Sequence, residues 1–102
     1  MKVESNIVNN DTGMTIVIHG RFDFSVANEF RNCYRNESVK SDYFIDLSDV
    51  VYMDSAAIGM ILLLREFSED KGTIKMINCS DSIKKIIAMS HIDRFVEISG
   101  WF

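Results

Sequence analysis

Strand-like and helix-like segments alternate along this chain, and that alternation constrains its fold more than any other feature. The strand-like segments are short, rich in β-branched and aromatic residues and bounded by polar residues: 14–19, 43–47 and 73–78. The segments that follow them carry apolar residues at helical spacing: 25–36, 56–67 and 83–90. This order predicts an α/β domain with a mixed, mostly parallel central sheet of four to five strands and helices packed against it.

An N-terminal β-hairpin is expected to precede the alternating part. Residues 3–8 and 14–19 are two short apolar stretches, and the turn-forming sequence Asn-Asn-Asp-Thr-Gly separates them at 9–13. A short final strand is expected at 95–98. Because the chain shows no linker, repeat or low-complexity tract, we expect one domain over residues 1–102.

Several local signals predict where the helices begin and end. Residues that commonly cap helices stand before each helical segment: Ser25, Asp54 or Ser55, and Ser80 or Ser82. Residues 20–24 are expected to form a loop, and residues 48–53 to lead out of the central strand as another loop. Gly72 is a reasonable stop for the second helix.

Composition excludes several classes of protein. The chain has 102 residues, which is enough for one hydrophobic core. Its formal net charge of −4 argues against phosphate-driven binding of nucleic acid. Two cysteines are too few for a disulfide framework, and Cys33 is expected to be a small structural hydrophobe. The longest apolar run covers nine residues, 56–64, and is too short to insert through a bilayer, so we expect a cytoplasmic protein.

The sequence lacks the common signatures of catalysis. There is no Gly-rich nucleotide-binding motif, no Gly-x-Ser-x-Gly and no Cys/His group at metal-binding spacing, so no cofactor or metal is expected. His19 and His91 lie far apart in the sequence, and neither belongs to a local catalytic motif. These absences predict a protein that is not an enzyme.

Ser55 is the most informative position, because it stands at the predicted start of an apolar helix. The simplest interpretation is structural: Ser55, or Asp54 beside it, caps the helix. A second interpretation is a phosphorylation site, since a helix N-terminus tolerates a phosphate and the added charge would repel a partner that fits the neutral serine. The residues alone favour the cap, because capping serines are common.

The residues around Ser55 also resemble a known family. The run from Asp46 to Gly59, Asp-Leu-Ser-Asp-Val-Val-Tyr-Met-Asp-Ser-Ala-Ala-Ile-Gly, is similar to the signature of the STAS domain of anti-sigma factor antagonists. Three further stretches resemble the family in the same order along the chain: 20–23, 63–72 and 80–90. The resemblance covers nearly the whole chain and implies a single STAS domain.

The resemblance implies phospho-regulated partner switching in the bacterial cytoplasm. In this family the antagonist binds a serine-kinase anti-sigma factor and thereby regulates transcription, and phosphorylation by that kinase ends the interaction until a phosphatase restores it. Ser55 matches the phosphoacceptor, and Asp23, Asp54, Ala56 and Ala57 match the surface that faces the partner. The resemblance therefore favours a phosphosite at Ser55, which can also act as a cap when free. ATP and magnesium would belong to the kinase.

Departures from the family pattern leave alternatives open. Ala56-Ala57 stands where Ser-Gly often follows the acceptor, and Arg21 stands where an acidic residue is common. STAS proteins also resemble regulatory subunits of membrane transporters, such as lipid-trafficking ABC systems, and partner-switching regulators of processes other than transcription. Self-association as a weak homodimer also stays open.

Overall fold

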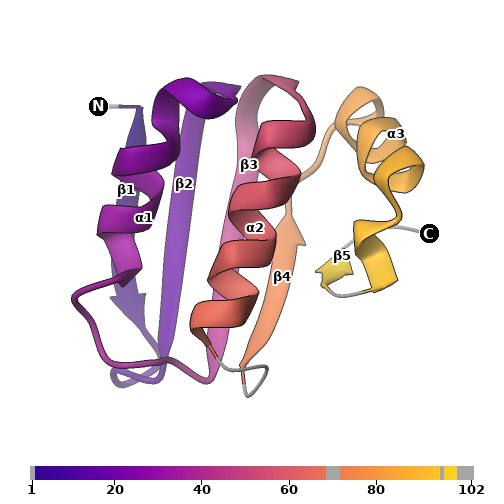
Figure 1. Ribbon diagram of the computed structural model, residues 1–102. Helices are drawn as coiled ribbons and strands as arrows, with labels where there is room; N and C mark the ends of the chain where they lie inside the picture. Colours follow the sequence, from indigo (N-terminus) through magenta and orange to yellow (C-terminus); the bar gives the residue numbers. More distant parts are fainter. Residues whose placement is uncertain (1, 69–71, 95, 99–102) are drawn as a thin grey trace.

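The computed structural model describes residues 2–68, 72–94 and 96–98, and within them a five-stranded sheet has the order β1-β2-β3-β4-β5. The strands are β1 (Val3–Val8), β2 (Gly13–Phe22), β3 (Asp42–Met53), β4 (Thr73–Ile77) and β5 (Glu97–Ile98). The helices are α1 (Ala27–Tyr34), α2 (Ser55–Phe67) and α3 (Asp81–Ser90), with 3-10 turns at Phe24–Val26 and Ile92–Arg94. The expected mixed α/β sheet is confirmed (Figure 1).

The N-terminal hairpin forms as predicted. β1 pairs antiparallel with β2, with Val3 opposite Ile18. Three residues in the connecting turn have positive φ angles of 55°, 55° and 75°: Asn9, Asn10 and Asp11. Asn and Asp tolerate this left-handed region better than most residues, which explains why they occupy the turn.

β3 is the central strand and pairs in parallel with both β2 and β4. It is longer than predicted, because the ladder between β2 and β3 resumes after register shifts near His19 and Gly20 and continues until Phe22 lies opposite Met53. The predictions of loops at 20–24 and 48–53 are therefore wrong for most of both segments. The bulges break the alternation of apolar and polar residues that marks a regular strand.

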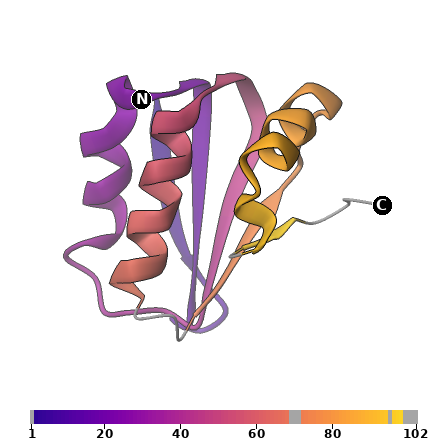
Figure 2. The same ribbon diagram turned by 45° about the vertical axis from the view of Figure 1, so that its right-hand side comes forward.

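The three helices lie over one face of the sheet (Figures 1 and 2). Alternate strand residues point into the core beneath them, including Ile16, Ile45 and Met76, which are fully buried and in register. The helices contribute buried apolar residues to the same core, such as Phe30, Ile61 and Ile87. One hydrophobic layer between helices and sheet thus stabilises the domain.

Helix boundaries differ from the prediction at two places. Asp23, not Ser25, is the N-cap residue before the first helical turn. α2 ends at Phe67 and its C-cap residue is Ser68, so Gly72 does not end the helix. A Cβ atom on Gly72 would lie 2.8 Å from the carbonyl oxygen of Lys40, so this glycine permits a close approach of two loops.

The C-terminal part agrees with the prediction in outline. Ser80 caps α3, since its hydroxyl accepts a hydrogen bond from the backbone N–H of Ile83. The final strand begins at Glu97 rather than at position 95, and Phe95 lies outside the described residues. Cys33 is partly buried and packs against the core, as expected for a structural thiol, and burial raises its pKa. No helix among the described residues is long and apolar enough to cross a bilayer.

Candidate functional site

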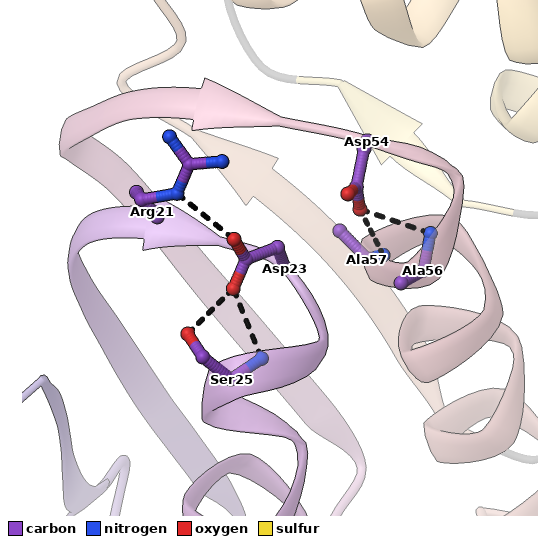
Figure 3. A network of polar contacts seen from close by, with 6 residues as sticks. All are labelled: Arg21, Asp23, Ser25, Asp54, Ala56 and Ala57. Atoms are coloured by element: carbon purple, nitrogen blue, oxygen red, sulfur yellow. Dashed lines mark hydrogen bonds and ion pairs between the residues drawn. The ribbon is translucent and has the colours of Figure 1, made fainter.

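Two aspartates mark the edge of the sheet where β2 and β3 end. Phe22 and Met53 are paired in register as the last residues of these strands, so Asp23 and Asp54 follow at the same level. Each aspartate has an extended backbone and acts as the N-cap of the helical segment that follows it. Figure 3 shows the two capping groups side by side at this edge.

Asp54 caps α2. Its Oδ1 atom accepts hydrogen bonds from the backbone N–H groups of Ala56, at 3.0 Å, and Ala57, at 3.4 Å (Figure 3). The carboxylate thereby satisfies two of the free N–H groups at the helix start and lies at the positive end of the helix dipole. Of the two capping candidates in the sequence, the structure selects Asp54.

Ser55 is the first residue of α2, and its side chain is exposed. Because Asp54 supplies the cap, the hydroxyl of Ser55 is not needed to begin the helix. Ala56 is partly buried, whereas the side chain of Ala57 is fully buried in the core. Ala57 therefore stabilises this edge through its core packing and its N–H group, and it does not offer a surface contact.

Asp23 organises the neighbouring corner. Its Oδ1 atom accepts hydrogen bonds from both the backbone N–H of Ser25, at 3.0 Å, and the Ser25 hydroxyl. Its Oδ2 atom accepts one from Nε of Arg21 at 2.9 Å (Figure 3). The Ser25 hydroxyl, followed by Arg21, lowers the pKa of Asp23 below its usual value. Asp23 thus carries a negative charge at neutral pH, about which this corner is ordered.

Arg21 also lies over the ring of Tyr52, with its guanidinium carbon 4.0 Å from the ring centroid. The two residues are paired across β2 and β3, so this cation–π contact links the ends of the two strands. In the sequence Arg21 is only a departure from the family pattern, and its contact with Tyr52 was not predicted. The pairing of these two residues depends on the bulged register of β2 and β3.

Apolar side chains are exposed close to this edge. Phe24, which follows Asp23, is 81% exposed, and Val51, near the end of β3, is 79% exposed. Large apolar side chains exposed to this degree are found at protein-binding surfaces. Neither residue was predicted from the sequence, although Phe24 directly follows the stretch 20–23 that resembles the family.

The described residues contain no group of three or more His, Cys, Asp or Glu side chains arranged to hold a metal ion. Both ring nitrogens of His19 are engaged by carboxylates: Nδ1 lies 2.6 Å from Asp49 and Nε2 lies 2.6 Å from Glu4. Carboxylates of β1 and β3 therefore hold this histidine on the sheet.

Sequence comparison identifies the family. The family model of the STAS domain matches residues 3–100, and the chain therefore belongs to this family. A STAS-domain containing protein of Pseudomonas aeruginosa strain UCBPP-PA14 is 39% identical over 88 residues, which cover 84% of this chain and 87% of that protein.

Solved structures share the fold at low sequence identity. A candidate anti-sigma factor antagonist from Thermotoga maritima is 22% identical with a TM-score of 0.77, covering 94% of this chain and 84% of the other. The phosphorylated form of the Bacillus cell fate determinant SpoIIAA is 14% identical with a TM-score of 0.65, covering 95% and 90%. A sulfate transporter family protein from Wolinella succinogenes is 13% identical with a TM-score of 0.71, covering 86% and 78%. The fold thus occurs in both regulators and transporters, and the site must distinguish them.

Proposed function

We propose that this chain is a phospho-regulated anti-sigma factor antagonist of a bacterial partner-switching pathway. In its unphosphorylated form it binds a serine-kinase anti-sigma factor or a similar regulator, and phosphorylation at Ser55 ends that binding. The chain itself is a binding module and kinase substrate in the cytoplasm. A cognate phosphatase removes the phosphate and restores binding.

One observation carries this proposal: Ser55 is exposed at the start of α2, while Asp54 supplies the cap. A phosphate can therefore be added to the Ser55 hydroxyl without removing a hydrogen bond that begins the helix. The positive end of the helix dipole favours a negative group there. The domain can stay folded in both states, as a reversible switch requires.

The charge introduced by the phosphate would act on the partner. A phosphoserine adds about −1.5 to −2 charge at neutral pH. It would be carried by the residue that directly follows Asp54, at the edge where Figure 3 shows both Asp54 and Asp23. A partner surface that fits this edge with a neutral Ser55 would then face a concentrated negative charge and would have to desolvate it. Asp23, Asp54, Ser55 and Ala56 are the proposed contact residues.

A comparative affinity capture tests the proposal. The wild-type chain, Ser55→Ala and Ser55→Asp serve as bait in lysate from the source bacterium, and bound proteins are identified by mass spectrometry. We expect the first two to retain a kinase-like ATPase and Ser55→Asp to lose it. Ser82→Asp is the matched control, because Ser82 is also exposed in the first turn of a helix, α3. Equal loss with Ser82→Asp would attribute the effect to net charge alone.

A phosphorylation assay completes the test. The captured ATPase, purified and supplied with ATP and magnesium, should add one phosphate to the wild-type chain and none to Ser55→Ala. An equal phosphate content in Ser55→Ala would refute the assignment of the site. Capture of an ABC transporter ATPase that is insensitive to Ser55→Asp would instead assign the chain to a transporter complex.

A further inference from the structure

The seam between α1 and α2 contains an open, mostly apolar groove. The two helices begin at the same edge of the sheet and run side by side over it (Figures 1 and 2). The groove has a volume of about 740 Å³, and residues of both helices and of the preceding turn line it: Phe24, Ala27, Phe30, Ala56, Gly59 and Leu63. Phe24 is 81% exposed and Leu63 is 52% exposed, so two large apolar side chains border it uncovered.

Gly59 lines this groove, and neither its packing nor its backbone conformation requires a glycine. A Cβ atom at this position would meet nothing within 4 Å, and Gly59 does not have a positive φ angle. Glycine in the middle of a helix is less favourable than alanine. The missing side chain instead deepens the groove and lets another chain approach the backbone of α2 closely.

Two arginines lie along this seam, Arg31 in α1 and Arg35 at the C-cap of that helix. Arg31 lines the groove, and Arg35, one turn later, lines a second hollow of about 370 Å³ that continues along the same seam. Neither guanidinium forms a salt bridge with a carboxylate in the described part of the chain. Glu66 borders the second hollow from α2. The rims are therefore basic along α1 and acidic at one position of α2, in a chain whose net charge is −4.

We propose that this groove binds an amphipathic helix of the regulatory partner, with carboxylates one turn apart that pair with Arg31 and Arg35. This inference rests on the proposed function, because the helix belongs to the same partner. The largely apolar lining offers few hydrogen-bonding groups, so a helix, which satisfies its own backbone, fits it better than an extended peptide. A basic residue on the opposite side of the helix pairs with Glu66 and fixes its direction.

The groove also connects the helix to the switch. Ala56 lines the groove and directly follows Ser55, so the bound helix passes the phosphorylation site at the start of α2. A phosphate there would place a charged, strongly hydrated group at the end of the groove where α2 begins, in addition to disturbing the edge contacts. Phosphorylation at Ser55 would therefore weaken binding in the groove.

Photo-crosslinking of the chain to its captured ATPase locates the contact. Benzoylphenylalanine at Leu63 probes the groove, and the same group at Val51 probes the sheet edge outside it. We expect crosslinks from Leu63 to a partner segment with apolar residues at helical spacing and acidic residues four apart. Crosslinks to the partner from Val51 alone, or from Leu63 to a second copy of this chain, would overturn the proposal.

Binding measurements with matched variants provide the quantitative test. Arg31→Glu should weaken binding of the ATPase about two- to fivefold, the range of an exposed ion pair, whereas Lys85→Glu on α3 makes the same charge change away from the groove and should not. Gly59→Trp should fill the groove and weaken binding about tenfold or more, while Gly59→Ala should reduce it little. Equal effects of Arg31→Glu and Lys85→Glu, or full binding by Gly59→Trp, would refute the groove. Release by Ser55→Asp in the same assay reports separately on the proposed function.

Discussion

The Oδ1 atom of Asp54 accepts a hydrogen bond from the backbone N–H of Ala56 at 3.0 Å. Ser55 lies between these two residues, and its own side chain is not needed for the cap. The hydrogen bond thus assigns helix capping and the proposed phosphorylation site to different residues, which the sequence alone could not do. The stability of α2 depends on Asp54, and the hydroxyl of Ser55 is free for another role.

Asp54→Ala should lower the free energy of unfolding by about 0.5–2 kcal/mol, because the N–H groups of Ala56 and Ala57 lose their acceptor. Ser55→Ala should change it by less than about 0.5 kcal/mol, the usual limit for an exposed substitution. Urea denaturation followed by circular dichroism measures both. Ser80→Ala, which removes the cap of α3, is a positive control and should resemble Asp54→Ala. If Ser55→Ala were as destabilising as Asp54→Ala, the serine would share the cap.

Gly72→Ala should destabilise the domain by about 1–3 kcal/mol, as overpacking does. The added Cβ would lie 2.8 Å from the carbonyl oxygen of Lys40 and 3.2 Å from that of Ser41. These backbone atoms cannot easily move, because the Ser41 carbonyl also accepts the N–H of Thr73 at 2.8 Å and so fixes the start of β4. Thermal unfolding of the variant measures the loss. An unchanged midpoint would show that the two loops can separate freely.

Gly59→Ala should have the opposite effect and raise the free energy of unfolding by up to about 1 kcal/mol. The added methyl group meets nothing within 4 Å, and alanine favours the helix more strongly than glycine. Denaturation of the isolated chain measures the change. A loss of stability would show that α2 needs glycine for its own packing, which would weaken the argument that Gly59 serves a bound partner.

The elements that the sequence predicted well are those in which local pattern and tertiary packing agree. The hairpin, the central parallel strand and a serine cap at the start of the last helix follow from turn residues, β-branched runs and capping chemistry. The site was predicted less completely. Ser25 and Asp23 are both good capping residues two positions apart, and the choice between them depends on where β2 ends. That end is set by bulged pairing with β3, a long-range relationship that no local pattern contains.

The groove could not be predicted for a related reason. Phe24 is an aromatic residue in a turn, and only the packing of α1 beside α2 shows that it borders a groove instead of entering the core. Arg31 and Gly59 are unremarkable in the sequence, since arginine on a helix surface and glycine in a helix have many causes. Their proposed role in binding depends on their lying along the same seam between α1 and α2, which is a property of the tertiary structure.

His19 should make stability depend on pH. Its two ring nitrogens lie 2.6 Å from carboxylates of neighbouring strands, Asp49 of β3 and Glu4 of β1. The hydrogen bond to Asp49, followed by that to Glu4, raises the pKa of His19 above 6.5. Because the folded state binds the proton more tightly than the unfolded state, this stabilisation is complete below the unfolded pKa of about 6.5 and is lost as pH rises through the folded value.

The stabilising effect of His19 relative to His19→Gln should therefore be larger at pH 6 than at pH 8.5. Thermal midpoints of both chains at the two pH values measure it, and the difference between the chains removes the pH dependence of all other groups. Glu4→Gln is the matched control, because it removes one of the two carboxylates that favour the protonated ring. In a Glu4→Gln background the same pH-dependent difference should become smaller. A difference that is constant with pH, or larger at pH 8.5, would show that the imidazole joins these strands in its neutral form.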